Sequence, residues 1–302
     1  MKPQIVIFTD DPGWHGRRLR LAFAARGCVT RNVSLRHCAV DLRAPGGLRI
    51  PGFAQALPDA AFVRGVPGGT LEQVVLRLDV LHALQALGVP VYNRARAIEV
   101  SVDKAMTSLL LHRSGVVTPP TWAVESEAQA RRLVLAETAR GHELVLKPLF
   151  GAQGAGLRRI ASPSDLPPPQ DCNNVYYLQR FVGPQSGQGE DYRVLVVGGT
   201  ARAAMTRRGA GWIHNVAQGA ACLPAPDGPE LGEMAVAATL ALDMDYAGVD
   251  LMRDREGRLT VLEVNSIPAW KGLQSQTAPD IAQLLVDDFL SRHVFADMRR
   301  TA

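Results

Sequence analysis

The segment that decides the fold of the second half of this chain is residues 249–265, VDLMRDREGRLTVLEVN. Two apolar runs flank a charged, turn-like connection, and this pattern predicts an antiparallel hairpin. Because side chains alternate along a strand, Glu263 and Asn265 share one face. Asp250 faces the same way if the turn contains an even number of residues, whereas a bulge would change this parity.

These three polar residues are candidate metal ligands. Two carboxylates and an amide oxygen on apolar strands repel one another and lose water, which is costly unless a cation lies between them. Oxygen ligands suit Mg²⁺ or Mn²⁺, which keep some of their waters and bridge to phosphates. On the hairpin alone, a solvated strand face with one salt bridge remains an equal alternative.

The composition is that of a globular enzyme. At 302 residues with 47% hydrophobic content, the chain can build one large domain or two to three small ones. The net charge of +4 is spread along the chain, which suits anionic ligands but does not indicate nucleic-acid binding. The four cysteines form no C-x-x-C pair, which is typical of a reduced, cytoplasmic protein. No signal peptide is expected, and no run approaches the roughly 18 apolar residues of a membrane span.

Strands and helices alternate in the first third, so we expect a small parallel sheet built from βα units. Its expected strands are residues 5–9, 60–63 and 89–92, and its helices are 15–26 and 71–87. Farther along, consecutive strands joined by short turns indicate antiparallel sheet. The helices expected there are 103–113, 126–140, 230–242 and 280–292, and the strands before the hairpin are 144–147, 157–160, 175–182, 193–197 and 201–206.

A glycine-rich turn, KPLFGAQGAG at residues 147–156, follows an apolar strand. Glycine backbone can approach phosphates closely and point its N–H groups at them. The spacing loosely resembles a dinucleotide fingerprint, but the residues after it favour a strand and not the helix that such a fingerprint opens. The turn is therefore expected to cover phosphates, with Lys147 neutralising their charge; an ordinary edge-strand lysine is the alternative.

Other polar residues are ambiguous when taken singly. Lys104 begins a helix and on its own is an ordinary exposed lysine. Residues 179–182, QRFV, belong to a strand whose backbone can hydrogen-bond a purine edge or can simply be part of a core. Asp191-Tyr-Arg193 and Arg207-Arg208 place positive charge beside a strand pair, and arginine suits carboxylates and phosphates.

The order of these motifs is more specific than any one of them. They follow one another as in the ATP-grasp superfamily, and the chain resembles the RimK-like amino-acid ligases over roughly residues 93–290. The resemblance implies an ATP-grasp fold of α/β class, with α+β character in the C-terminal half. It also implies a pre-ATP-grasp domain on the acceptor side (1–95), a small lobe with the glycine turn (96–185) and a large lobe with the metal site (186–302).

The resemblance further implies a reaction. ATP phosphorylates a carboxylate, an amine attacks the acyl phosphate, and ADP and phosphate leave. Because the protein mainly positions the reactants and neutralises charge, no Ser/His/Asp or Cys/His nucleophile is needed. The implied ATP-binding residues are Lys104, Lys147, Gly151, Gln153, Gly154, Gln179, Arg180, Phe181, Val182 and Asp191; the catalytic ones are Arg193, Arg207 and Asn215; and Asp250, Glu263 and Asn265 would hold two Mg²⁺ or Mn²⁺ ions.

Two positions depart from the RimK-like pattern. Ile213 and Gln218 stand on either side of Asn215 where arginines are usual, which affects the handling of the acyl phosphate or the choice of carboxylate donor. Arg207 or Arg208 is a candidate to compensate. Two other functions therefore stay open: an accessory or sensor module that binds nucleotide without ligating, and a dinucleotide-dependent oxidoreductase.

The resemblance also bears on the substrates. Residues 64–73 and 266–274 resemble the branch of tetrahydromethanopterin-biosynthesis ligases, which implies L-glutamate as the amine and a pterin side-chain carboxylate as the acid. Candidate walls for an acceptor pocket, each with core or loop packing as its alternative, are Trp14, His15, Trp212, His214 and Trp270. The expected partners are thus a small-molecule acid and an amino acid, without nucleic acid or membrane; a homo-oligomer stays open.

Overall fold

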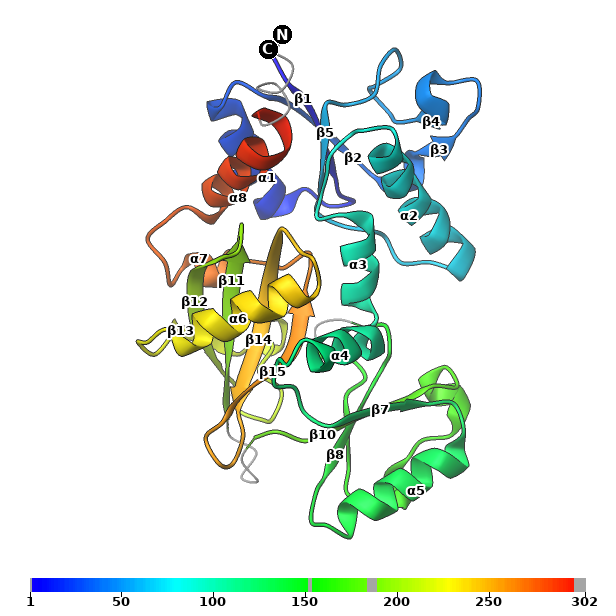
Figure 1. Cartoon of the computed structure of the whole chain (residues 1–302), viewed down its shortest axis with the longest axis vertical. Helices are drawn as coiled ribbons and strands as arrows, with labels where there is room; N and C mark the ends of the chain where they lie inside the picture. Colours follow the sequence, from blue (N-terminus) through cyan, green and yellow to red (C-terminus); the bar gives the residue numbers. More distant parts are fainter. Residues whose placement is uncertain (1, 152–153, 184–188, 296–302) are drawn as a thin grey trace.

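The structure, a computed structural model, describes residues 2–151, 154–183 and 189–295 as a mixed α/β fold (Figure 1). Its first sheet is parallel, in the order β2-β1-β5-β6. These strands are β1 (Gln4–Phe8), β2 (Val29–Val33), β5 (Ala60–Val63) and β6 (Val91–Tyr92). The apolar strands β1 and β5 are buried because α1 (Gly13–Ala25) covers one face and α2 (Leu71–Ala86) covers the other.

The edge strand β2 and the small hairpin beside the sheet were not predicted from the sequence, whereas the other edge, β6, was. Strand β2 is mostly exposed and lacks an apolar pattern, so backbone pairing with β1 holds it in place. The hairpin of β3 (Ala39–Val40) and β4 (Leu48–Arg49) is shorter still, with 3₁₀ turns at Leu35–His37 and Pro45–Gly47 beside it. The conformation of such elements is determined by contacts with neighbouring elements and not by their own sequences.

The second sheet is antiparallel, in the order β7-β10-β8-β9. Its strands are β7 (Thr121–Val124), β8 (Leu144–Lys147), β9 (Arg158–Ile160) and β10 (Tyr176–Arg180), with 3₁₀ turns at Pro163–Asp165 and Pro169–Cys172. Helix α5 (Glu127–Thr138) packs on one face. Helix α4 (Lys104–Arg113) begins at the predicted residue because the Asp103 carboxylate accepts two N–H groups of its first turn. The preceding α3 (Ala95–Val102) was not predicted.

The third sheet is antiparallel, with one apolar face and one face that is partly polar. Its order is β13-β12-β11-β14-β15, and its far edge, β13, was not predicted. The strands are β11 (Glu190–Val197), β12 (Thr200–Arg208), β13 (Ala221–Pro224), β14 (Tyr246–Arg253) and β15 (Leu259–Asn265). Helix α6 (Glu230–Ala241) covers the apolar face. The opposite face carries polar side chains at one end, whereas Leu195, Val197, Met205 and Tyr246 make its other end apolar.

A bulge sets the register of the predicted hairpin. Arg253 pairs with Leu259, so the turn between them, residues 254–258, holds an odd number of residues. Without a bulge, that turn would place Asp250 opposite Leu262. The register shifts at this point, so that Asp250 pairs with Glu263 instead. The two carboxylates therefore lie on the same face, as predicted, although the cause is the bulge and not the turn.

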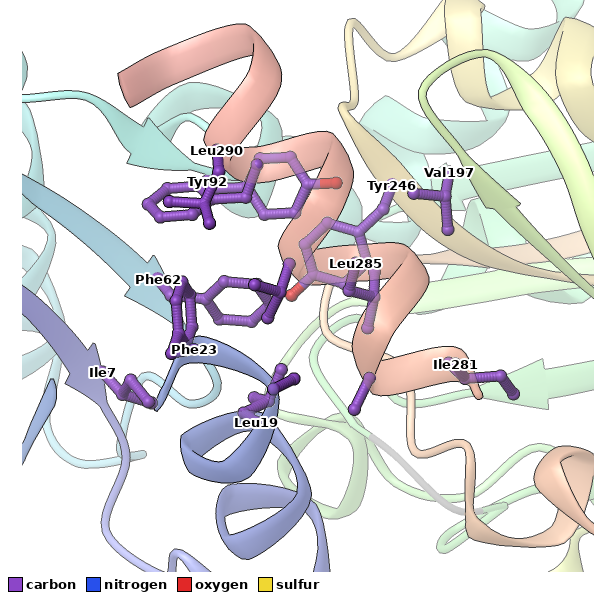
Figure 2. Close-up of a cluster of buried hydrophobic side chains, with 14 of the residues drawn as sticks. Ile7, Leu19, Phe23, Phe62, Tyr92, Val197, Tyr246, Ile281, Leu285 and Leu290 are labelled. Carbon is purple, nitrogen blue, oxygen red and sulfur yellow. The ribbon is translucent and has the colours of Figure 1, made fainter. Parts of the chain in front are cut away.

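The end of the chain returns to the first sheet. After α7 (Lys271–Gln274), helix α8 (Ile281–Phe289) continues into a π-helical turn at Leu290–Val294. Figure 2 shows side chains of α8 between those of the first sheet and α1 on one side and those of β11 and β14 on the other. The first and third sheets thus share one hydrophobic core.

The predicted division into 1–95, 96–185 and 186–302 stays a prediction. Each of the three larger sheets falls within one of these ranges, while α8 belongs to the last range and packs on α1 of the first. Within the described ranges, every helix is too short or too polar to cross a membrane.

Replacement of Phe289 by alanine tests the shared core. The Phe289 ring is fully buried, 5.6 Å from the Phe23 ring and 5.4 Å from that of Tyr92. Because the cavity would open between two sheets, we expect Phe289→Ala to lower the free energy of unfolding in urea by about 3–5 kcal/mol. The control is Leu240→Ala on α6, where the side chain is 64% exposed and a change within about 0.5 kcal/mol is expected. Equal losses in both variants would contradict the shared core.

Candidate active site

A cleft with about 850 Å³ of empty space, including the solvent at its mouth, lies between the second and third sheets. The predicted residues that line it are Lys104, Lys147, Gly151, Gly154, Gln179, Arg180, Phe181, Val182, Asp191, Arg207, Asn215, Asp250 and Glu263. Two predicted residues, Arg193 and Asn265, lie on the same sheet face but not in the lining. The prediction for Gln153 falls outside the described residues.

The polar face of the third sheet forms one wall of this cleft. Asp191 on β11 pairs with Arg207 on β12, and two residues farther along β11, Arg193 pairs with Asp250 on β14. Asp250 in turn pairs with Glu263 on β15. Since residues two apart on a strand face the same way, these five side chains share one face across four strands.

Four of these side chains form a buried charge network. Arg207 donates two hydrogen bonds to Asp191, at 2.6 and 2.8 Å, and its Nη2 lies 3.1 Å from an oxygen of Asp250. Arg193 donates two further hydrogen bonds to Asp250. The two arginines and the two carboxylates cancel in charge, which permits their burial.

The network affects its two carboxylates differently. Burial alone would raise the pKa of Asp250, but Arg193 and Arg207 outweigh it and hold that pKa below its usual value. Burial raises the pKa of Asp191, and Arg207 opposes this only in part. Asp250 therefore stays ionised to a lower pH than Asp191, and the ionised form is the one that a cation would require.

Lys147 is held in the opposite wall by Gln179. The Lys147 Nζ donates to the Gln179 Oε1 at 2.6 Å, and the Gln179 amide nitrogen donates to the Thr121 hydroxyl at 3.0 Å. Burial, and then the nearby Lys104, lower the pKa of Lys147 to about 8, while Glu263 and Asp250 oppose the shift. Gln179 is thus a positioning residue for Lys147, and the part of Thr121 in this chain of contacts was not predicted.

Lys104 links the glycine turn to the acid hairpin. Its Nζ donates to the Gly151 carbonyl at 2.8 Å and lies 3.9 Å from a Glu263 oxygen. Burial lowers the pKa of Lys104, and Glu263 and Asp103 oppose it. The sequence alone favoured an exposed lysine, whereas the side chain is only 13% exposed and points to the cleft.

Residues 180–182 present backbone and not charge to the cleft. The Arg180 side chain is engaged by the buried Glu137 at 2.6 Å, so its guanidinium is not available to a phosphate. The N–H groups of Arg180 and Phe181 donate to the carbonyls of Pro120 and Glu143. Among the described residues, the Val182 N–H has no such partner, which makes it the candidate for a purine edge.

The residues that depart from the RimK-like pattern pack against the glycine turn. A Cβ placed on Gly154 would lie 2.9 Å from Ile213 Cγ2, 3.0 Å from Asn215 Oδ1 and 3.1 Å from Gln218 Nε2. Gly154 also has a φ of +73°, which disfavours other residues. Glycine is therefore required here, and residues 213–218 border the part of the turn that is expected to lie over phosphate.

The predicted metal ligands fit Mg²⁺ by donor type. Among the described residues there is no cluster of three or more His, Cys, Asp or Glu side chains able to hold a metal, so the protein would supply two carboxylates and one amide. A carboxylate offers about four acceptor positions, and the arginines use three on Asp250. Asn265 donates from Nδ2 to the Gly248 carbonyl at 3.4 Å, which leaves its oxygen for coordination. This small number of protein ligands is appropriate for a magnesium ion that also binds phosphate oxygens.

The aromatic residues predicted for an acceptor pocket separate into two places. Trp212 and His214 line the cleft. Trp14, His15 and Trp270 instead pack on one another beside the first sheet, with ring centroids 5.1 Å apart for the first pair and 4.5 Å for the second. The five residues therefore do not form a single wall of an acceptor pocket.

Residues 101–289 match the RimK-like ATP-grasp domain. The chain belongs to this family. This RimK-like protein is 35% identical over 237 residues to the tetrahydromethanopterin:alpha-L-glutamate ligase of Methanococcus maripaludis. The aligned region covers 76% of this chain and 78% of that protein. It is 28% identical over 300 residues to the ribosomal protein bS6–L-glutamate ligase of Escherichia coli, covering 95% of each.

Solved structures agree with the fold. The ATP-grasp ligase PsnB, complexed with a minimal precursor, has a TM-score of 0.73 at 20% identity and covers 96% of this chain and 99% of its own. D-cycloserine synthetase DcsG has a TM-score of 0.70 at 18% identity. PsnB has also been solved with Mg and ADP. The predicted fold, the ligase class and the general use of ATP and Mg²⁺ are thus confirmed, and the family favours a ligase over the accessory module and the oxidoreductase.

The pKa of Lys147 gives a pH test of its predicted phosphate contact. A bound phosphate favours the charged lysine, and the charge of free Lys147 is lost as the pH rises through about 8. We therefore expect the affinity for Mg-ADP to fall by up to roughly tenfold per pH unit above pH 8, measured by calorimetry between pH 7 and 9.5. Lys147→Met should bind weakly at every pH, and Lys147→Arg should lose most of the pH dependence. A wild-type affinity that stays constant to pH 9.5 would contradict the contact.

Proposed function

We propose that this RimK-like ligase joins L-glutamate to the carboxylate of a small-molecule acid, with ATP as the energy source. The observation that carries the proposal is the polar sheet face on which Arg207, Arg193, Asp250 and Glu263 lie in register opposite Lys147. Relatives named as alpha-L-glutamate ligases support glutamate as the amine. A relative that acts on tetrahydromethanopterin supports a pterin-like acid as the acceptor.

The cleft residues divide the work by charge. Lys104 and Lys147 attract the phosphates of ATP, and the backbone after β10 accepts the adenine. Asp250, Glu263 and Asn265 would hold two Mg²⁺ or Mn²⁺ ions, whose charge would offset that of the phosphates. Arg193 donates to Asp250 and would interact with the transferred phosphate.

Formation of an acyl phosphate solves the chemical problem of this reaction. A free carboxylate resists attack by an amine because oxide is a poor leaving group, whereas phosphate leaves readily. Positive charge from Arg193, Arg207 and the lysines stabilises the oxygens that become more negative in the transition state. Asn215, which lies beside the glycine turn, supplies a neutral polar group at the same end of the cleft. Ile213 makes that end less positive than in the usual RimK-like pattern, so Arg207 bears more of the charge stabilisation.

Glu263→Gln tests the assignment. Wild-type protein with ATP, Mg²⁺, L-glutamate and tetrahydromethanopterin should release phosphate and add one glutamate residue to the acid, seen by mass spectrometry. Because the variant removes one carboxylate from the cation site, we expect kcat to fall by roughly 100-fold. The matched control is Glu256→Gln in the same hairpin, where the side chain is exposed in the turn and far from the chemistry.

Two outcomes would count against the proposal. Equal activity of Glu263→Gln and Glu256→Gln would remove the metal assignment. Tight binding of Mg-ATP by the wild type, without turnover across a panel of pterin, peptide and other small acids, would favour the nucleotide-binding module instead.

A further inference from the structure

A second polar site lies at the carboxyl ends of β1 and β5. In the first sheet, the chain passes from β1 to β2 on one side and returns to β5 on the other side of β1. The point between β1 and β5 is thus a topological switch point, where open α/β sheets bind ligands outside the carboxyl ends of their strands. Arg64 directly follows β5, and α1 begins shortly after β1.

Arg64 is a partly buried cation without an anionic partner. Its Nη1 donates to the Pro268 carbonyl at 3.0 Å, and its guanidinium lies over the Trp270 ring, 4.6 Å from the centroid. Its Nε is buried and has no hydrogen-bond partner, and no carboxylate of the described residues forms an ion pair with it. Burial of a charged donor in this state is costly, and an anion bound at Arg64 would offset the cost.

Some neighbours of Arg64 can also act as donors, while the Tyr246 side chain favours the charged form of Arg64. The backbone N–H of Trp270 donates to the Nε2 of His15 at 3.1 Å, which leaves the ring proton of the neutral histidine on Nδ1. Burial, and then Arg64 and Lys271, lower the pKa of His15 to about 4, so the ring is neutral at pH 7. The first turn of α1, which includes His15, has no side-chain cap and no acidic residue of its own. Asp11 is the carboxylate that offsets this positive character at His15.

Pro268 connects this site to the proposed reaction centre. A Cβ on Gly248 would lie 2.6 Å from the Pro268 Cβ and 3.3 Å from the Arg193 Nη1. Pro268 therefore touches the neighbourhood of Arg193 on one side and binds Arg64 on the other. A substrate that extends past Pro268 can place one group at Arg64 and its reacting group at Arg193.

We infer that Arg64, with His15 and Lys271, binds a substrate carboxylate that is not the one activated. The inference rests on the proposed ligase function. A planar guanidinium fork suits a carboxylate, and Asp11 would repel a phosphate dianion more than a singly charged carboxylate. Both substrate classes, an amino acid and a small-molecule acid, can supply the group. The carboxylate positions that substrate and takes no part in bond formation.

Kinetics of Arg64→Gln separate the two sources. We expect the KM of one substrate, L-glutamate or the acceptor acid, to rise by roughly 10- to 100-fold, which is the range for loss of a charge-assisted hydrogen bond. The KM of ATP should not change, and kcat should change less than KM. Arg20→Gln is the matched control, since Arg20 is an exposed arginine on α1. Lys271→Gln, at an exposed position with less risk to folding, should raise the same KM by a smaller factor.

Direct binding makes the test independent of turnover. Calorimetry on the Mg-ADP complex, with L-glutamate and with tetrahydromethanopterin as probes, should show a loss of affinity for one probe in Arg64→Gln and not in Arg20→Gln. Wild-type affinities for both probes in Arg64→Gln and in Lys271→Gln would overturn the inference. If the wild type binds a probe through Arg64 but forms no product, the proposed function fails while the carboxylate site stands.

Discussion

The position of Arg207 between two buried carboxylates is the constraint on which the reactive face depends. Its guanidinium bonds to Asp191 and reaches Asp250, while Arg193 bonds to Asp250 from the neighbouring strand. Loss of one member would leave an uncompensated buried charge, which typically costs 3–5 kcal/mol in proteins. The network therefore holds β12, β11 and β14 in one register and keeps Asp250 ionised beside the cleft.

The hairpin was predictable from the sequence, but its decisive detail was not. The apolar runs and the charged turn of residues 249–265 sufficed to predict two antiparallel strands. The parity of Asp250 relative to Glu263 depended on a bulge opposite Asp250, and a bulge reflects packing that no local pattern reveals. Likewise, the partners of Arg193 and Arg207 follow from the place of β11 between β12 and β14, which is a property of the whole sheet.

Elements with their own signals were predicted closely, and those held by neighbours were missed. The Thr70 capping box and the Asp103 cap fix the starts of α2 and α4 through local hydrogen bonds. Strand β2 and helix α3 carry no such signals, because an exposed edge and a short connecting helix owe their form to tertiary contacts. The motif order identified which residues gather in the cleft, whereas the roles of Gln179 and Thr121 in holding Lys147 required three-dimensional contacts.

The shared core of Figure 2 has a consequence for synthesis of the chain. On the ribosome, domains generally fold as they emerge, from the N-terminus onward. Here Phe23 and Phe62 emerge early, but their buried partners Leu285 and Phe289 come from the last helix. The first sheet can pair its strands and pack α1 and α2 during translation, yet the apolar side chains that α8 covers, such as Phe23 and Phe62, stay exposed until α8 has left the exit tunnel. During that interval the nascent chain would expose a surface of the kind that chaperones bind.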